Sequence, residues 1–166
     1  CKSAALISKT GSIDWCCLPD FNSMSVFARL LDREKGGCFA IQPEGDYSIQ
    51  QSYIRKTNIL MTHFSDGVNA FELIDFMPRY KLEPYGYHCP PDLVRYFRWV
   101  SGNPRFRVVY DPRLNYGQGS TKTDIIDIGI KSTVRNGTYE SLYLYTDLAY
   151  AAVLQQQVIT LRQGAF

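Results

Sequence analysis

The sequence predicts an all-β fold, an antiparallel β-sandwich with one short helix near residues 23 to 31. Apolar and polar residues alternate with a period of two over many short stretches, which is typical of half-buried strands. Turn-forming residues separate these stretches at short intervals, as they do in sandwiches and barrels. The chain contains 12 Tyr, 9 Phe and 2 Trp, a bias that favours pleated sheets over helices.

The chain opens with a predicted β-hairpin. The segments "SAALIS" and "SIDWCCL" flank the short stretch "KTG", in which Gly11 can adopt a positive φ. On the second strand, Trp15 is expected on the same face as Ile13 and Cys17, where it would be the core anchor of the hairpin. Asp14 is expected on the opposite face of that strand.

A helical pattern follows this hairpin. Four apolar residues occur at i, i+3, i+4 and i+7, which is one face of a helix: Met24, Phe27, Ala28 and Leu31. Asn22 or Ser23 can cap its start, and Gly36-Gly37 ends the segment that follows. We therefore expect a short amphipathic helix over residues 23 to 31, lying over the edge of a sheet.

Strand signals continue through the rest of the chain. Turn segments such as "SDG" and "SGNP" separate the stretches, because such residues do not continue a strand. In the segment "IIDIGIKSTV", Ile126, Ile128 and Ile130 are expected on one strand face. The further predicted strands cover residues 46–55, 58–64, 68–78, 93–100, 105–111, 125–134 and 139–146.

Length and charge limit the possible functions. The 166 residues fit one domain that is large enough to bury a core. The formal net charge of +2 is too small to indicate a nucleic acid or a membrane surface as a partner. No apolar run approaches a membrane span. Because the chain begins at Cys1 and ends in the strand-like "QQQVITLRQGAF", we expect residues 1–166 to be one domain of a longer protein.

The five cysteines show no pattern of a metal site. Their spacing matches neither CxxC nor a Cys/His zinc framework, so we expect no metal and no cofactor. Cys16 and Cys17 are adjacent on a predicted strand and therefore point to opposite faces. We expect the cysteines to act as small hydrophobic residues in a reduced, cytoplasmic setting.

Few side chains offer catalytic chemistry. The two histidines are His63 and His88, and a dyad of His88 with the adjacent Cys89 is conceivable, but neighbours in sequence rarely meet in the geometry that activates a thiolate. A glycosidase needs two facing carboxylates. Four aspartates lie at strand ends or in loops, where such a pair could gather: Asp14, Asp20, Asp75 and Asp111. Aspartates also close turns, so we assign no acid pair a catalytic role.

Several aromatic residues have polar neighbours, a combination that suits carbohydrate. Pyranose C–H faces stack on aromatic rings while Asp, Asn and Arg bind the hydroxyls. The alternative is that these rings are core and edge residues of the sandwich. The pairs with this character are Trp15 with Asp14, Phe21 with Asn22, and Arg113 with Tyr116.

The same segments carry a resemblance to a known family. "SAALISKTGSIDWCCLPDFNSMSVFARLLDREKGGCFAIQPEG" resembles the opening of bacterial glycoside hydrolase family 15 proteins, the glucoamylase and trehalase-like enzymes. Their pattern there has the form AAL(V/I)S-x-x-GSIDW-x-CLP-x-FDSPSVFA-x-LLD-x-x-x-GG. "YIRKTNILMTHFSDGVNAFELIDFMPR" is similar to their next segment, which ends in D-F-M-P. "LVRYFRWVSGNPRFRVVYDPRLNYG" is similar to their LVR, G-x-V and PRFDYG segments.

Two positions depart from the family pattern. FDSPS is FNSMS here, so that Asn22 replaces an acid, and PRFDYG is PRLNYG, so that Asn115 replaces another. Both amides can still cap turns, and the two exchanges are therefore compatible with the fold. A charge-dependent contact with substrate or a partner domain at these two positions is put in doubt.

The resemblance implies a function for the whole protein. Members of this type have an N-terminal β-sandwich, of the super-β-sandwich type, followed by an (α/α)6 barrel. The barrel carries the acid and base glutamates that hydrolyse α-glucosidic bonds with inversion. Residues 1–166 would then be the non-catalytic N-terminal domain, with the C-terminal barrel of the same protein as partner and an α-glucoside or trehalose as the parent's substrate.

Three functions follow as hypotheses. The first is a domain that docks on the catalytic barrel and supports it, with a substrate or interface rim formed by Asp14, Trp15, Phe21, Asn22, Arg113 and Tyr116. The second is an independent carbohydrate-binding module with exposed Trp and Tyr as its platform. The third is a stand-alone enzyme. An exposed apolar patch would favour the first, and a row of coplanar exposed aromatic rings the second.

Overall fold

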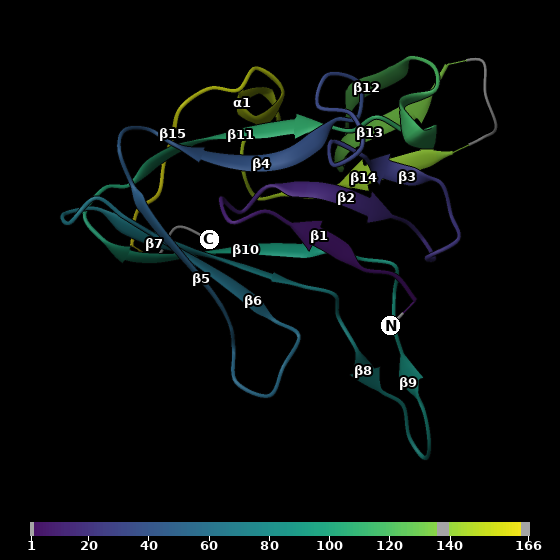
Figure 1. Ribbon diagram of the computed structural model, residues 1–166, viewed down its shortest axis with the longest axis horizontal. Helices are drawn as coiled ribbons and strands as arrows, with labels where there is room; N and C mark the ends of the chain where they lie inside the picture. Colours follow the sequence, from purple (N-terminus) through teal and green to yellow (C-terminus); the bar gives the residue numbers. More distant parts are fainter. Residues whose placement is uncertain (1, 136–139, 164–166) are drawn as a thin grey trace.

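The fold is almost entirely antiparallel β, as the sequence predicts (Figure 1). The structure is a computed structural model that describes residues 2–135 and 140–163. The largest sheet has the order β1-β2-β4-β11-β15, with β3 paired to the free part of β2. Its strands are β1 (Ala5–Ile7), β2 (Ile13–Cys17), β3 (Ser25–Phe27), β4 (Cys38–Pro43), β11 (Arg105–Asp111) and β15 (Ile159–Thr160).

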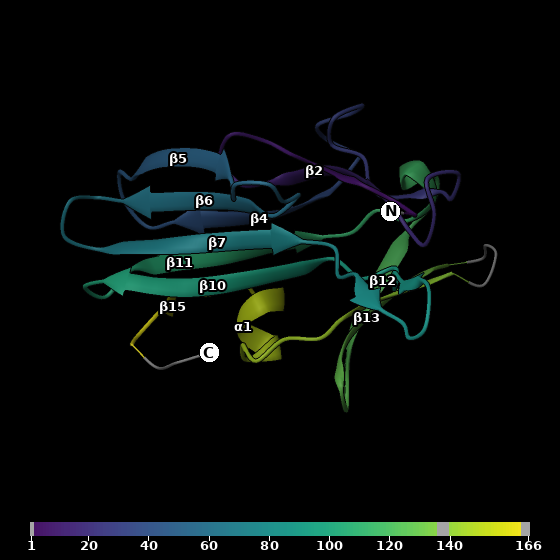
Figure 2. The same cartoon turned by 90° about the horizontal axis from the view of Figure 1, so that it is seen from below.

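A four-stranded sheet packs against this six-stranded sheet, and Figure 2 shows the two from a second direction. It has the order β10-β7-β6-β5 and contains β5 (Ser48–Tyr53), β6 (Leu60–Ser65), β7 (Ala70–Phe76) and β10 (Val94–Ser101). Two smaller sheets complete the fold. They are the β12-β13-β14 sheet of β12 (Thr121–Ile126), β13 (Gly129–Val134) and β14 (Ser141–Leu144), and the projecting hairpin of β8 (Tyr80–Lys81) and β9 (Tyr87–His88).

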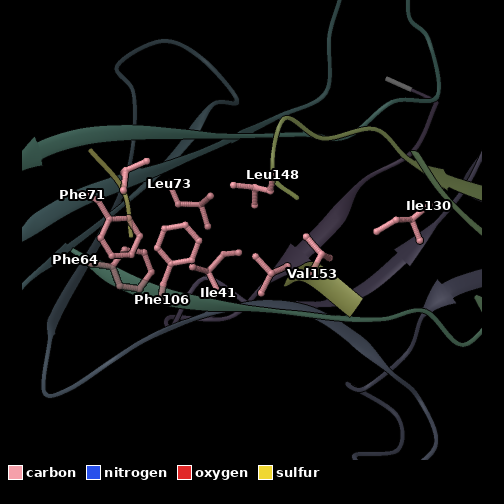
Figure 3. Packing of buried hydrophobic residues seen from close by; sticks show 10 residues of the cluster. Ile41, Phe64, Phe71, Leu73, Phe106, Ile130, Leu148 and Val153 are labelled. Atoms are coloured by element: carbon pink, nitrogen blue, oxygen red, sulfur yellow. The ribbon is translucent and has the colours of Figure 1, made fainter. Parts of the chain in front are cut away.

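The main core lies between the two larger sheets (Figure 3). Phe64 and Phe71 stack with ring centroids 4.6 Å apart on the four-stranded sheet. The ring centroid of Phe106 of β11 lies 5.4 Å from that of Phe71, so this ring joins the opposite sheet to the stack. The helix α1 (Tyr150–Leu154) packs on β11 and contributes the buried Val153. Burial of such rings is the largest favourable term in a core of this kind.

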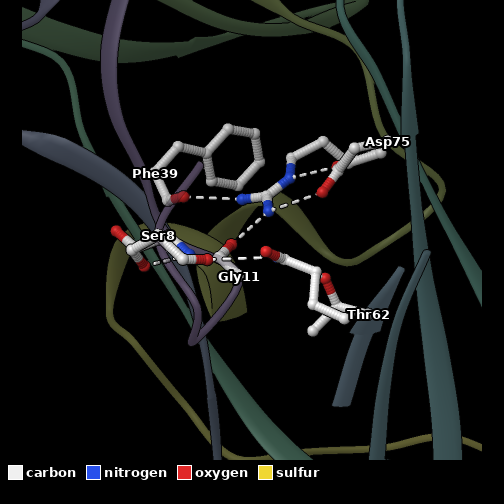
Figure 4. A network of polar contacts seen from close by, with 8 residues as sticks. Ser8, Gly11, Phe39, Thr62 and Asp75 are labelled. Carbon is white, nitrogen blue, oxygen red and sulfur yellow. Dashed lines mark hydrogen bonds and ion pairs between the residues drawn. The ribbon is translucent and has the colours of Figure 1, made fainter. Parts of the chain in front are cut away.

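A buried ion pair also connects the two larger sheets, in addition to the aromatic core. Arg95 of β10 and Asp75 of β7 are directly opposite each other in the ladder, and their side chains are 3% and 1% exposed. The Arg95 Nε lies 2.8 Å from the Asp75 Oδ1. The two terminal nitrogens of Arg95 also donate to backbone carbonyls, to Phe39 of β4 at 2.6 Å and to Gly11 in the β1–β2 turn (Figure 4). All three guanidinium nitrogens therefore donate at least one hydrogen bond.

A second polar contact attaches the β1–β2 hairpin to the four-stranded sheet. The side-chain nitrogen Nε2 of Gln51 donates to the Ser8 carbonyl at 3.1 Å and to the Thr62 hydroxyl at 3.0 Å (Figure 4). Together with the bond from Arg95 to Gly11, it holds both sides of the hairpin turn. The predicted hairpin is thus confirmed, and its turn is anchored to the opposite sheet.

The helix predicted over residues 23–31 is not formed. Ser25–Phe27 is strand β3, and turns follow it. The Ala28 amide donates to the Gly36 carbonyl at 2.7 Å, so the backbone pairs across the loop instead of within a helix. Met24 and Leu31 are 39% and 69% exposed, although the helical pattern would bury them. The short helix of this fold is α1 instead.

Two further expectations are corrected by the register. The segment 125–134 turns back at Asp127 and Ile128, because Ile126 pairs with Gly129, and Ile128 is 62% exposed. In β2 a bulge shifts the alternation, since Leu6 pairs with Trp15 but Ile7 pairs with Ile13. As a result Ile13 and Cys16 are buried in a second, smaller core, while Trp15 is only half-buried and does not anchor it. The other buried members of this core are Val26, Phe27 and Leu114.

The buried ion pair predicts a large effect of Asp75→Ala on stability. Removal of the carboxylate leaves the Arg95 guanidinium buried without its counter-ion, and the free energy of unfolding in urea is expected to fall by about 3–5 kcal/mol. The control is Asp124→Ala, which removes the partner of Lys122 from an exposed ion pair. This substitution is expected to change the free energy of unfolding by less than about 1 kcal/mol. Equal effects of the two substitutions would contradict the role assigned to Arg95.

Candidate functional site

The predicted rim residues Trp15 and Tyr116 lie side by side in the structure. Their ring centroids are 6.1 Å apart, and the ring planes are inclined by 38°. Trp15 comes from β2, whereas Tyr116 lies in the short 3-10 turn η1 (Asn115–Gly117) after β11. Both Asn115 and Tyr116 have left-handed backbone conformations, with φ of 55° and 56°. Asn tolerates this conformation, so the exchange at position 115 fits the turn.

The loop between β3 and β4 is bonded to the strand that carries Trp15. The Arg29 amide donates to the Gly37 carbonyl at 3.1 Å, and the Leu30 amide donates to the Asp14 carbonyl at 2.9 Å. Gly37 has φ of 66°, and a Cβ there would lie 2.1 Å from the Asp111 carbonyl oxygen. Only glycine allows this close approach. The loop is therefore fixed against both β2 and the end of β11.

The segments joined by these contacts carry four apolar residues, here called the rim surface: Leu6, Trp15, Leu30 and Tyr116. Leu6 and Trp15 are cross-strand partners and therefore share a sheet face. Leu6, Leu30 and Tyr116 are 52%, 60% and 43% exposed. Sequence reasoning had named Trp15 and Tyr116 but not the two leucines. Leu30 does not belong to the apolar face of the predicted helix. In that helix it would be a single exposed leucine, which does not indicate an interaction surface.

Arg113 borders the rim surface but its charge is paired. Its Nε donates to the Asp111 Oδ1 at 2.8 Å, and its backbone amide donates to the Val26 carbonyl at 3.0 Å. The side chain is 43% exposed and also lies next to Gly37. Arg113 can therefore offer its remaining guanidinium hydrogens to a partner without leaving an unpaired charge.

The four aspartates considered for catalysis are separately engaged. The Asp14 Oδ1 accepts a hydrogen bond from the Ser12 hydroxyl at 2.6 Å, and the Asp75 carboxylate is buried with Arg95. Asp111 pairs with Arg113. Asp20 begins a turn in which the Ser23 amide donates to its carbonyl at 3.1 Å. Each aspartate therefore has a local structural role, three through the carboxylate and Asp20 through its backbone.

Phe21 and Asn22 lie on a separate loop. The Phe21 amide donates to the Lys2 carbonyl at 2.8 Å, and the ring is 63% exposed. The preceding Leu18 and Pro19 line a small pocket with the base of the β8–β9 hairpin. Asn22 is exposed and caps no helix, since none begins there. The turn is closed by the Ser23 hydroxyl, which accepts a hydrogen bond from the Asp20 amide.

The thiols of β2 are buried and unpaired. Cys16 and Cys17 are 0% and 5% exposed, and both are free. Burial raises the pKa of the Cys16 thiol to about 12, and the neighbouring Cys17 adds to this effect. A thiol in this state is a poor nucleophile and a poor metal ligand. Among the described residues no three His, Cys, Asp or Glu side chains gather as a metal site.

Within residues 2–135 and 140–163, no helix has the length and apolar character needed to cross a membrane.

The chain resembles known proteins over most of its length. Residues 1–155 match the family described as "Trehalase-like, N-terminal". The chain is 39% identical over 120 residues to a trehalase of Thermoplasma volcanium, and 40% identical over 114 residues to a trehalase of Thermoplasma acidophilum. It is 36% identical over 124 residues to trehalase 2 of Sulfolobus acidocaldarius. These three relatives are archaeal, whereas the sequence patterns had suggested bacterial proteins.

Coverage differs between this chain and these relatives. The matches include 70%, 67% and 75% of this chain but 19% of each relative, so the chain spans about a fifth of their length. No solved structure matches.

The burial of Cys16 predicts slow alkylation in the folded state. Because the thiol is buried and its pKa is raised to about 12, Cys16 is expected to react with iodoacetamide at pH 8 only after unfolding in urea. Peptide mass spectrometry checks the modified site. Cys89, which is only partly buried, is the internal control and is expected to react in the folded protein. Labelling of Cys16 at the rate of Cys89 would contradict the buried assignment.

The exposure of Phe21 predicts that its ring contributes little to folding. Phe21→Ala is expected to change the free energy of unfolding by less than about 0.5 kcal/mol, as is usual for surface substitutions. Phe27→Ala, at a position only 4% exposed, is expected to cost about 3–5 kcal/mol. Chemical denaturation of both variants checks the comparison, and a large loss for Phe21→Ala would mean that its ring packs into the fold.

Proposed function

This chain belongs to the family of trehalase-like N-terminal domains, and we propose that it is a non-catalytic domain that docks on and supports the catalytic domain of the same protein. The observation that carries this proposal is the rim surface of Leu6, Trp15, Leu30 and Tyr116. Exposed apolar side chains grouped on a rigid frame are typical of an interaction surface. A rigid frame also lowers the entropy that is lost on docking.

The rest of the predicted rim has a place in this proposal. Asp14 and Arg113 would form its polar border, because each already has a partner that holds it in place. Phe21 and Asn22 would form a second contact at the loop beside the β8–β9 hairpin. The exposed Phe21 ring supplies apolar area there, while the Asn22 amide can bind a backbone group or a sugar hydroxyl.

We further propose that the whole protein is a glycoside hydrolase that cleaves an α-glucoside, with trehalose as the first substrate to test. The relatives at 36–40% identity are named trehalases, which supports this choice. The catalytic acid and base would come from a C-terminal (α/α)6 barrel and act with inversion. The buried, unpaired thiols favour a reducing, cytoplasmic location.

A charge on the rim surface tests the docking role. In the full-length protein, Leu30→Glu is expected to lower kcat/KM for trehalose by about tenfold or more, since burial of an unpaired carboxylate opposes docking. The matched control is Val68→Glu, which charges an aliphatic side chain that is 73% exposed in the turn between β6 and β7. This control is expected to retain the wild-type rate.

Two measurements separate docking from folding. Limited proteolysis reports whether the domains come apart, and chemical denaturation of the 166-residue chain reports whether its own fold is intact. Docking predicts faster cleavage between domains for Leu30→Glu at unchanged stability of the chain. Wild-type activity and wild-type proteolysis of Leu30→Glu would refute the proposal.

A further inference from the structure

A groove opens between the two larger sheets, beside the β1–β2 hairpin. Its volume is about 430 Å³, inside the range of roughly 300 to 1,000 Å³ that small-ligand sites occupy. The buried Ala40 and Ile41 of β4 line it from opposite faces of that strand. Thr10 and Ser12 of the hairpin turn form one wall. The other polar lining side chains are Arg29, Gln42, Asp46 and Tyr47.

Several polar groups of the groove have unused bonding capacity. Arg29 donates to the Cys38 Sγ at 3.3 Å, and no carboxylate lies within ion-pair distance of it in the described part of the chain. Gln42 and Asp46 are exposed, and their side chains form no hydrogen bond or ion pair with the residues that the structure describes. The groove therefore offers one cation, one anion and one amide.

Other parts of the groove are held in place. The Ser12 hydroxyl donates to Asp14, and the Ser12 amide donates to the Ser8 hydroxyl at 3.2 Å. The Tyr47 ring packs edge-on against Phe71 at 6.1 Å, and its hydroxyl bonds to Asp66. A fixed aromatic ring beside free polar groups is the arrangement that binds a C–H face and hydroxyls together.

We propose that this groove is a binding site for a neutral pyranoside. The opposite charges of Arg29 and Asp46 cancel, so the walls favour a ligand without net charge. A carboxylate, an amide and a guanidinium supply acceptors and donors for adjacent hydroxyls, and such charge-assisted bonds are the stronger ones. The Tyr47 ring suits the C–H face of a sugar. The proposal goes beyond the docking role, and only the choice of trehalose as a probe rests on the proposed function.

The test is a titration of the ¹⁵N-labelled 166-residue chain with glucose and with trehalose, followed by NMR. Amide shifts are expected in the groove, at the hairpin turn and over residues 40–47, with saturation in the millimolar range. Gln42→Ala and Asp46→Ala are each expected to weaken binding by roughly tenfold, because each removes hydrogen bonds to the ligand. The matched control is Gln50→Ala, on the strand face opposite to the groove-lining Ile49, and it is expected to bind as the wild type does.

Each other outcome overturns the proposal. No shifts with either sugar, or shifts centred on another surface such as Tyr143 and Tyr145, would show that the groove is not the site. Equal affinity of Gln42→Ala and the wild type would contradict the hydrogen bond to the ligand that is assigned to Gln42. Tighter binding of glucose 6-phosphate than of glucose would show that the groove selects an anion. Chemical denaturation of each variant shows that its fold is retained. Because the docking test uses Leu30→Glu in the full-length protein, failure of either proposal leaves the other intact.

Discussion

The buried pair of Arg95 and Asp75 is the constraint on which the arrangement of the sheets depends. A guanidinium that is almost fully removed from water needs hydrogen-bond acceptors, and here all three of its nitrogens donate, to one carboxylate and two backbone carbonyls. Those carbonyls belong to Gly11 in the β1–β2 turn and to Phe39 in β4 of the opposite sheet. The position of the β1–β2 hairpin is therefore tied to the interior of the four-stranded sheet.

This constraint explains why three sequence motifs meet in space. Gly11 opens "GSIDW", Asp75 opens "DFMP" and Arg95 closes "LVR". In the fold they form one network, so these motifs reflect the cost of leaving a buried charge unpaired rather than a catalytic centre. The aspartate of "DFMP" looks available for chemistry in the sequence. Its role in the structure is to neutralise Arg95.

The anchored hairpin supports both proposed surfaces. On one side, the Asp14 carbonyl holds the loop that carries Leu30, and Trp15 contacts Tyr116 on the rim surface. On the other side, Ser12 lines the groove between the sheets and donates to the Asp14 carboxylate. The two surfaces are thus neighbours that share one rigid element, and a domain docked at the rim would lie close to a ligand in the groove.

The sequence by itself determined the all-β class, the positions of most strands and the opening hairpin, because period-two alternation and turn residues are local signals. It also pointed to Trp15 and Tyr116.

Only the tertiary structure decided that Ser25–Phe27 pairs with β2 as a strand, since the same apolar spacing suits a helix or a strand followed by turns. The bulge in β2, and with it the exposure of Trp15, depends on register with β1. The groove joins Thr10, Arg29, Gln42 and Asp46 from separate segments, and contacts between distant segments exist only after the sheets have packed.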